Sequence, residues 1–489
     1  MLNKDFSLVN ANWENRFGSK TKLDIVIAIL WQVTVFSAFW GNCLFPIDIP
    51  FGRLFLFRFM VVLLSFILIW KYFSQRVNPF KQFSKKQIPL LVFIGVYLTY
   101  GIFSCFIAID TVYTIRKLVN VFFSCGFLVL FLLIVNNKQT FTYTLANCTI
   151  NLLFIEILSI YEIIARTGLF DSAYDGLVSQ LGMGIPILSF GNTNNLSSAI
   201  MLIFPFCIYL LFSQLENSSG LRRIVLKAIT FIIGIFAIFI IFNAGARLVI
   251  ISAILFFAIL LVFTAVKKRS LLFIPIILLL FLLFLNFVTH AGGFDKAAVM
   301  LKSKESKVSI TKAMFDLSKV IGTTEEYVVE SAETGEKTFN ASASGGVRAN
   351  LIISGLKISR DSYYLGVGLG NAEQLLKEKK YSVPRYIRGK YKEILNFHNY
   401  AICLLAEFGI FIALPAISFA ILFLGTVFRR LQRKKEYEYQ LLYSMVLASI
   451  VMFPILSSVP SDALALYPMW IVIGIWGYLC GYKERVVGI

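Results

Sequence analysis

Three side chains stand out for the chemistry that they can perform, because each lies at or near the end of an apolar segment. Arg247 follows a glycine-containing turn, Arg348 follows two glycines, and His398 begins a long apolar run. A guanidinium presents a planar fork of donors that suits bidentate binding of a phosphate. An imidazole titrates near neutral pH and can accept a proton from an attacking hydroxyl. The sequence thus offers two anion-binding groups and one general base.

Each of these side chains also has a purely structural explanation. Arg247 fits a snorkelling arginine at a membrane surface, Arg348 a solvated charge in a lysine-rich loop, and His398 an interfacial histidine. Glu407 would lie about 13 Å deeper than His398 on an ideal helix. We therefore expect Glu407 to bond neighbouring helices rather than to orient His398 directly.

The remaining motifs argue against metal and cofactor chemistry. The segment Gly366–Asn371 is rich in glycine but lacks the spacing of a dinucleotide-binding loop, so it predicts a tight turn that starts a helix. The chain has only two histidines, no Cys-x-x-Cys pair and no Asp-x-Asp pair. These features disfavour a zinc site and a nucleotide-sugar transferase that clamps a metal. We predict neither a metal nor a cofactor.

Apolar helices must position these residues. The chain is 58% hydrophobic and 15% charged, whereas soluble domains are about 45–50% apolar and about 25% charged. A helix needs about 20 apolar residues to cross the hydrocarbon of a bilayer. The sequence predicts an all-α, polytopic membrane protein with about twelve transmembrane helices. The predicted spans are Leu23–Trp40, Leu54–Trp70, Ile88–Ile107, Tyr113–Val135, Phe141–Ile164, Leu196–Phe212, Ala228–Asn243, Leu248–Val266, Leu271–Thr289, His398–Phe428, Leu441–Val459 and Ala463–Gly481.

Positive charge predicts the orientation of these spans. Much of the formal net charge of +19 falls in short loops that share one side, including Lys71–Lys86, Lys267–Arg269 and Arg429–Lys435. Because cytoplasmic loops are enriched in Lys and Arg, both termini are predicted to be cytoplasmic. The charge therefore indicates membrane orientation rather than a nucleic-acid partner. The N-terminus shows no cleavable signal, so the first apolar run is expected to remain as a helix.

One long polar loop divides the chain. We predict transmembrane helices over 1–289, an extracytoplasmic loop or cap domain over 290–397, and three further transmembrane helices over 398–489. Within the loop, Lys302–Ser344 is expected to be poorly ordered and Gly345–Asn396 to fold as a small helical cap.

Two charged residues and one short apolar segment fall at membrane depth. Arg58 and Glu156 lie inside predicted spans, so we expect both to face the interior of the helix bundle. The outward segment Ala165–Asn194 is expected to be re-entrant, because its apolar part is too short to span.

Four segments resemble the O-antigen ligase and polymerase family, and they occur in the family's order over roughly residues 185–425. The His-Asn pair that opens an apolar helix with Glu and Gly at fixed offsets is the most specific of them. Ala246 stands where the family usually has Ser. The segments are Phe190–Asn195, Asn243–Arg247, Arg348–Gly368 and His398–Ile410.

The resemblance implies a metal-independent glycosyltransferase that moves a glycan from an undecaprenyl diphosphate carrier to a hydroxyl acceptor outside the cytoplasmic membrane. Arg247 and Arg348 would bind the diphosphate, and His398 would act as the general base. The implied substrate-binding residues are Arg247, Arg348, Asn192, Asn195 and Asn399. The implied partners are the lipid-linked oligosaccharide donor, a glycan acceptor and the bilayer. The chain also resembles teichuronic acid biosynthesis membrane proteins of Gram-positive bacteria, so the product would be teichuronic acid, capsule or a related polysaccharide.

Other functions remain open at this stage. A flippase or exporter of the same lipid-linked glycan would need a polar path through the membrane core, and the few charges within the spans count against it. A non-catalytic scaffold for wall assembly would tolerate the loss of both His398 and Arg247. Polymerase and ligase share the same motifs, so the sequence favours neither.

Overall fold

The computed structural model describes residues 21–481, apart from 50–51, 172–182, 217, 268–271, 291–328, 331–336, 339–342, 379, 383, 388–389, 394–395, 434–436, 461–463 and 465. Helices dominate this part of the chain, and the strands in it form three two-stranded hairpins. Nine of the described helices are long and apolar enough to cross a membrane, which confirms the predicted fold class. They are α3 (Leu56–Ser74), α4 (Ile88–Ser104), α5 (Thr111–Ile134), α6 (Lys138–Ala165), α7 (Thr193–Glu216), α8 (Gly220–Asn243), α9 (Arg247–Lys267), α17 (Ile410–Arg433) and α18 (Tyr437–Leu456).

Three further helices occupy the other predicted spans. They are α2 (Lys22–Ala38), α10 (Phe273–His290) and α19 (Tyr467–Gly481). Several helices start where the sequence supplies a capping side chain, which satisfies backbone N–H groups that the helix leaves free. Asp110 accepts from Tyr113 N at the start of α5, and Thr21 forms a capping box with Asp24 at the start of α2.

Contacts between helix ends set the directions of the helices. Phe263 near the end of α9 contacts Tyr437 at the start of α18, with ring centroids 5.7 Å apart. Tyr209 near the end of α7 donates to Glu438 (3.2 Å), and Lys138 at the start of α6 pairs with the same carboxylate (3.0 Å). The opposite end of the bundle therefore gathers the starts of α7 and α9 and the ends of α6 and α18.

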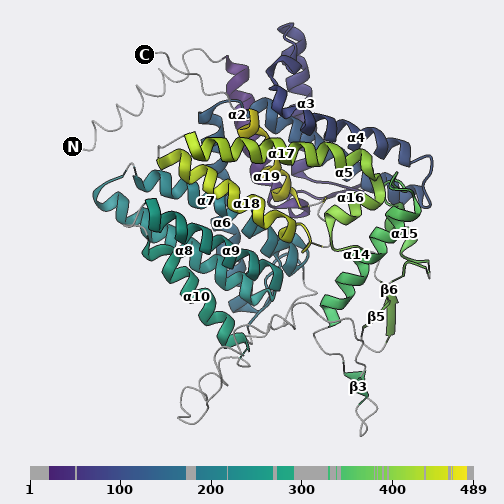
Figure 1. The fold of residues 1–489 in the computed structure, drawn as a ribbon. Helices are drawn as coiled ribbons and strands as arrows, with labels where there is room; N and C mark the ends of the chain where they lie inside the picture. Colours follow the sequence, from purple (N-terminus) through teal and green to yellow (C-terminus); the bar gives the residue numbers. More distant parts are fainter. Residues whose placement is uncertain are drawn as a thin grey trace.

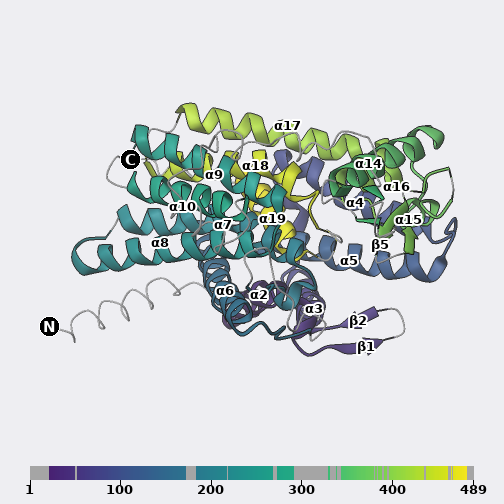
Figure 2. The ribbon, with the colours of Figure 1, turned by 90° about the horizontal axis from the view of Figure 1, so that it is seen from below.

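That opposite end, here named the cap end, carries the helices that follow the long loop. These are α14 (Ala343–Asp361), α15 (Asn371–Leu375) and α16 (Tyr400–Phe408). Tyr400 N donates to Ser457 O just beyond the end of α18 (3.3 Å), and Thr114 Oγ1 at the start of α5 donates to Leu369 O (3.1 Å). In both Figure 1 and Figure 2, α14, α15 and α16 lie together at the right, and Figure 2 shows the hairpin of β1 (Ile47–Ile49) and β2 (Gly52–Leu54) at the same end.

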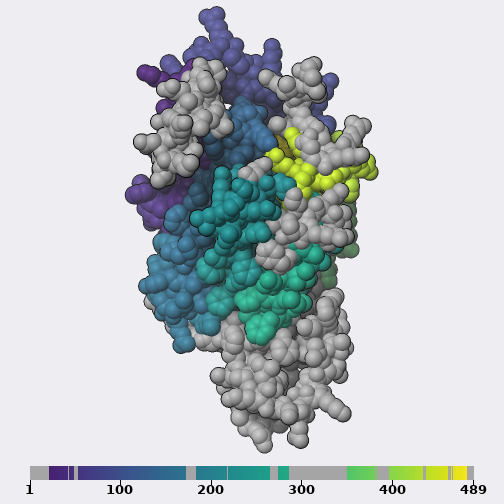
Figure 3. All heavy atoms as spheres, turned by 90° about the vertical axis from the view of Figure 1, so that its left-hand side faces the viewer, coloured from purple at the N-terminus to yellow at the C-terminus, as the bar shows by residue number. Residues whose placement is uncertain are grey.

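The other end of the bundle, here named the basic end, carries the start of α2 and the end of α19. Lys71 in the last turn of α3 pairs with Asp24 (2.7 Å), and Phe141 at the start of α6 stacks on Tyr478 of α19 at 4.6 Å. Figure 3 looks onto this end, where segments from early, middle and late in the sequence meet. The helices thus alternate as the charge pattern predicts, while the assignment of this end to the cytoplasm stays a prediction.

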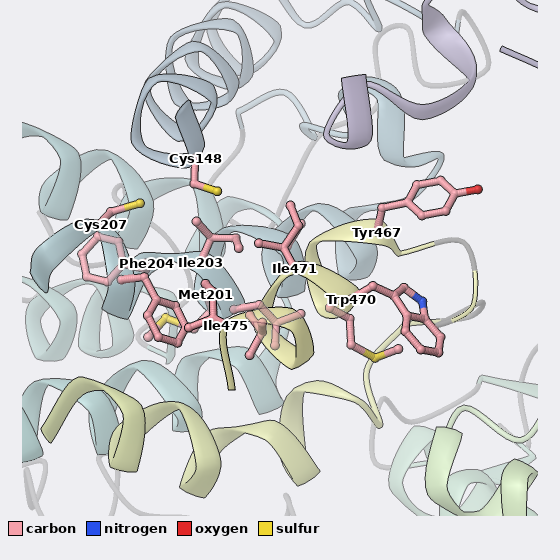
Figure 4. Close-up of a cluster of buried hydrophobic side chains, with 14 of the residues drawn as sticks. Cys148, Met201, Ile203, Phe204, Cys207, Tyr467, Trp470, Ile471 and Ile475 are labelled. Carbon is pink, nitrogen blue, oxygen red and sulfur yellow. The ribbon is translucent and has the colours of Figure 1, made fainter. Parts of the chain in front are cut away.

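Helix α7 forms the centre of the bundle. In its most apolar stretch, 94% of the residues are buried inside the protein. Figure 4 shows its side chains interdigitating with those of α19. The labelled residues are Met201, Ile203, Phe204 and Cys207 of α7, Tyr467, Trp470, Ile471 and Ile475 of α19, and Cys148 of α6. Close packing of this kind holds helices together in lipid, where apolar burial alone provides little drive.

The two charged residues predicted to face the interior do so. Arg58 is 7% exposed, donates to Arg53 O and Asn120 Oδ1, and lies between the rings of Phe55 and Phe123. Glu156 is fully buried on α6. Both predictions are confirmed.

The predicted tenth span, His398–Phe428, is wrong as one helix. The chain breaks at Gly409, whose φ is +57°, and forms the short α16 and the long α17 instead. A Cβ at Gly409 would lie 2.0 Å from Tyr364 O, so the approach of this backbone requires glycine. Ile410 N then donates to Tyr364 O (2.8 Å), which anchors the start of α17. Only α17 is long enough to cross the membrane.

The cap is not purely helical, which corrects the prediction for Gly345–Asn396. Besides α14 and α15 it contains an antiparallel hairpin of β5 (Pro384–Ile387) and β6 (Lys390–Glu393). The cap has its own small apolar core, made of Leu351, Ile358, Ala372, Leu376, Tyr381, Phe397 and Ala406. The last of these belongs to α16, so α16 is a part of the cap as well as of the bundle.

The segment before α7, which is predicted to face outward, folds over the end of α6. The Glu162 carboxylate accepts from the backbone N–H groups of Leu169, Ile187 and Leu188. The central part of the segment predicted to be re-entrant (172–182) lies outside the described residues. So does most of Lys302–Ser344, in which the structure describes the strands β3 (Val329–Glu330) and β4 (Lys337–Thr338) and the first residues of α14.

Candidate functional site

His398 lies in a constrained turn directly before α16. Its φ is +48°, which is uncommon for a residue with a side chain. Its backbone N–H donates to Asn396 Oδ1 (2.9 Å). The next residue, Asn399, caps α16 by accepting from Ile402 N (3.1 Å). Because Tyr400 N also bonds the chain beyond α18, the half-buried His398 is held at the cap end of the bundle.

The glycine-rich segment after α14 wraps around the other end of α16, which confirms the predicted tight turn and helix start. Gly366, Gly368 and Gly370 all have positive φ values. Val367 N donates to Ala406 O (3.0 Å) and Gly368 N to Glu407 O (2.9 Å). These bonds satisfy carbonyl groups that the end of a helix otherwise leaves without partners. The turn therefore supports α16 and does not form a phosphate-binding loop.

A buried group of charges lies beside this turn. Lys117 Nζ of α5 is 2.6 Å from Glu373 Oε2 of α15 and 3.7 Å from Glu407 Oε1 of α16. Tyr113 of α5 donates its hydroxyl to Glu373, and Gly370 N donates to Glu407 Oε1 (2.8 Å). The exposed fractions of the three charged side chains are 14%, 6% and 2%. We name Lys117, Tyr113, Glu373 and Glu407 the Lys117 cluster.

The environment of Glu407 favours the protonated form of its carboxyl group. Burial raises the pKa of Glu407 to about 7; Lys117 and the Gly370 N–H act against this rise, and the nearby Glu373 adds to it. The expectation that Glu407 bonds neighbouring helices instead of orienting His398 is confirmed by its contacts with α5 and with the glycine turn.

A small cavity of about 30 Å³ connects the Lys117 cluster to the start of α16. Lys117, Glu373 and Glu407 line one part of it, and Asn399 and Tyr400 line another. A space of this size with several polar walls suits a single water molecule. The cavity thus lies between the Lys117 cluster and the residues next to His398.

Arg247 is the first residue of α9 and is exposed. Gly245, with φ +65°, allows the tight turn between α8 and α9. Because α9 runs antiparallel to α18, Arg247 lies at the cap end. The free N–H groups and the dipole of a helix N-terminus favour an anion at this position, in addition to the guanidinium.

Arg348 lies in the second turn of α14 and is half-buried. Helix α14 packs directly on α16, whereas α9 packs mainly on α18, whose end contacts α16 at Tyr400. The elements that carry Arg247, Arg348 and His398 therefore share the cap end of the bundle.

Asn192 and Asn195 have structural roles in this fold. Asn192 Oδ1 accepts from Asn195 N (2.8 Å) and so caps α7. Asn195 Nδ2 donates to Phe190 O (3.0 Å) and fixes the turn before that helix. Contact of either residue, or of Asn399, with a substrate stays a prediction. In the described part of the chain, no group of three or more His, Cys, Asp and Glu side chains is arranged to hold a metal.

Comparison with known proteins agrees with the motifs at the cap end. Residues 229–417 match the family model described as O-antigen ligase. The chain resembles the O-antigen ligase family, as its motifs predict. It is also 22% identical over 452 residues to the teichuronic acid biosynthesis protein TuaE of Bacillus subtilis (strain 168), a match that covers 92% of this chain and 83% of that protein. The segment that resembles O-antigen ligases contains Arg247, Arg348 and His398, but not Lys117.

The sequence motifs missed the Lys117 cluster. A signal for Lys117 existed, since it is a charged residue inside the predicted span Tyr113–Val135, and such residues generally face a partner or a cavity. Its partners Glu373 and Glu407 could not be assigned in the same way. They are far from Lys117 in the sequence, and the glycine turn that brings Glu373 to α5 is a tertiary feature.

Proposed function

We propose that this chain is a membrane glycosyltransferase that polymerises or ligates glycan units carried on undecaprenyl diphosphate. The observation that supports the proposal most is the match to O-antigen ligases over residues 229–417, the segment that contains Arg247, Arg348 and His398. The elements that carry these residues share one end of the bundle, as a single site requires. The similar Bacillus subtilis protein is named for teichuronic acid biosynthesis, so a wall or surface polysaccharide is the product class that we propose.

In the proposed reaction, a hydroxyl oxygen of the acceptor attacks the anomeric carbon of the donor glycan. The bond from that carbon to the diphosphate oxygen breaks, and His398 accepts the hydroxyl proton. The leaving lipid diphosphate carries negative charge, which Arg247 and Arg348 would stabilise without a metal. Asn192, Asn195 and Asn399 are proposed to contact the substrates as well.

The proposed site faces outward, with both termini in the cytoplasm. Basic residues at the opposite end of the bundle support this orientation, among them Lys71 and Lys138. Nucleotide sugars are scarce outside the cell, so a donor that arrives already activated on a lipid fits a site at the cap end.

Purified protein in lipid nanodiscs, given a lipid-diphosphate-linked repeat unit, tests this proposal. A ladder of products indicates a polymerase, and a single transfer to an added acceptor indicates a ligase. We expect His398→Ala to abolish transfer and to leave donor binding intact, whereas His290→Ala, which removes the other histidine of the chain, keeps transfer. Transport of the donor across a vesicle membrane without any transfer would instead identify a flippase and refute the proposal.

A further inference from the structure

Helix α16 is short, and the structure holds it at both ends. At its start, Asn399 caps the helix and Tyr400 contacts both Ser457 O and the hydroxyl of Tyr97 on α4 (3.0 Å). At its end, Glu407 lies against Lys117 and the glycine turn. His398 directly precedes the helix, so any shift of α16 moves the proposed general base.

Helix α5 provides the platform for this arrangement. Thr114 bonds Leu369 O in the glycine turn, and Ile109 N just before α5 donates to Asn371 Oδ1 at the start of α15 (2.9 Å). Lys117 lies one turn further along α5 and contacts the carboxylates of both α15 and α16. It therefore links three elements, although it is outside the segment that matches O-antigen ligases.

The charges of the Lys117 cluster do not balance if both carboxyl groups are ionised. One ammonium then faces two carboxylates in a site that is almost closed to water, which leaves an uncompensated buried charge. Glu373 is the closer partner of Lys117 and also accepts from Tyr113. Glu407 is further from Lys117, so the extra proton belongs on its carboxyl group.

Among the residues that the structure describes, the other titratable groups around Glu407 do not supply a second cation. Tyr97 of α4 and Cys403 and Tyr400 of α16 face it, and a phenol or a thiol carries no positive charge in either of its protonation states. On α14, Arg360 and Asp361 pair at the surface, where Asp361 also binds Lys380. The basic residues of α17 (Arg429, Arg430 and Arg433) lie at its far end.

We propose that Lys117 is a positioning residue for His398, and that the Lys117 cluster holds α16 most firmly when Glu407 carries a proton and the cluster is neutral. The inference rests on the proposed transferase function. Transfer then depends on pH in two ways. A neutral His398 is needed as the base, so transfer rises with pH, and ionisation of Glu407 loosens α16, so transfer falls at higher pH. The expected profile of kcat against pH is a bell.

Two variants make the Lys117 cluster neutral at high pH. Glu407→Gln leaves the Lys117–Glu373 pair, and Glu373→Gln leaves Lys117 paired with an ionised Glu407. In either variant we expect the falling limb of kcat to disappear while the rising limb remains. Asp361→Asn is the matched control, because Asp361 also binds a lysine and a tyrosine, Lys380 and Tyr381, but lies at the surface. Asp361→Asn should keep the bell-shaped dependence of kcat on pH.

Lys117→Met tests the positioning role itself. We expect kcat to fall by about tenfold or more while the KM for the lipid-linked donor changes little, because His398 lies next to α16 whereas the arginines lie on other helices, α9 and α14. Lys117→Arg should recover part of kcat. A bell that persists in both Glu407→Gln and Glu373→Gln, or a Lys117→Met enzyme with unchanged kcat, would overturn the inference.

A second readout does not need activity. The thermal unfolding midpoint of the wild-type protein in nanodiscs should fall between about pH 4.5 and 7 relative to that of Glu407→Gln. If the wild type shows no transfer but its unfolding midpoint falls in this way, the proposed function is refuted, while the inference that Glu407 carries a proton in the Lys117 cluster is retained. If transfer occurs but the unfolding midpoints of the wild type and of Glu407→Gln change in the same way with pH, the inference about the proton is wrong and the proposed function is retained.

Discussion

The break between α16 and α17 gives a sharp test of the fold at the cap end. Gly409 has φ +57° and ψ −143°, and a Cβ there would lie 2.0 Å from Tyr364 O. Gly220 at the basic end has nearly the same φ, +55°, but a Cβ there meets nothing within 4 Å. The two glycines therefore share a positive φ and differ in the space around them.

An alanine at either position bears the cost of a positive φ, about 1–2 kcal/mol. At Gly409 the methyl group must also displace the backbone of Tyr364. That shift endangers the bond from Ile410 N to Tyr364 O (2.8 Å) and the bond from Val367 N to Ala406 O (3.0 Å). At about 1 kcal/mol for each bond, we expect Gly409→Ala to destabilise the protein by about 3–4 kcal/mol. Gly220→Ala should cost about 1–2 kcal/mol.

The assay is unfolding of the purified protein in mixed detergent micelles, followed by circular dichroism and by protease accessibility of the cap. Gly409→Ala should lower the unfolding midpoint clearly more than Gly220→Ala does. It should also make the cap accessible to protease before the bundle unfolds. Equal midpoints for the two variants would refute the reasoning, because the contact with Tyr364 would then contribute nothing.

Three further predictions concern charge, catalysis and capping. Burial raises the pKa of Glu407 from 4.5 to about 7, so the folded chain retains a proton that the unfolded chain releases. The retained proton stabilises the folded protein by about 3 kcal/mol. This stabilisation is fully present below about pH 4.5 and is lost as the pH rises through about 7. Denaturation at a series of pH values, with Glu407→Gln as the reference, should show this loss of stability. Arg247→Ala should lower the transfer rate by about 10²–10³, whereas Arg222→Ala at the basic end should not; equal rates for these two variants in the nanodisc assay would contradict the role of Arg247. Asn192→Ala should cost about 1 kcal/mol of stability because α7 loses its cap, and an unfolding midpoint equal to that of the wild type would exclude that role.

Much of the membrane architecture could be predicted from the sequence, because length and hydropathy are local properties. Every predicted span contains a helix. The tenth span differs because it contains two helices instead of one, and the apolar run from His398 to Phe428 does not indicate where the first helix ends. The break depends on the contact of Gly409 with Tyr364, which is distant in the sequence, and on a turn of glycines that caps α16.

The site could be predicted only in part, for a related reason. Arg247, Arg348 and His398 stood out by residue type and by their positions at the ends of apolar segments. Lys117 is a charged residue inside a predicted span, but its significance lies in its distances to Glu373 and Glu407, which only the folded chain shows. For Asn192, the sequence suggested a contact with substrate but not the structural role that the residue has. Its side chain caps α7, and this contact is visible only in the folded chain.

The central position of α7 has a consequence for biogenesis. This helix is almost entirely enclosed, with α6, α8, α9, α18 and α19 around it. Two of these neighbours come from the last part of the chain, so the ribosome has nearly finished when they emerge. Until then one flank of α7 must rest against lipid or an insertase. A nascent chain that stops before Tyr437 can insert its earlier helices, but it cannot enclose α7.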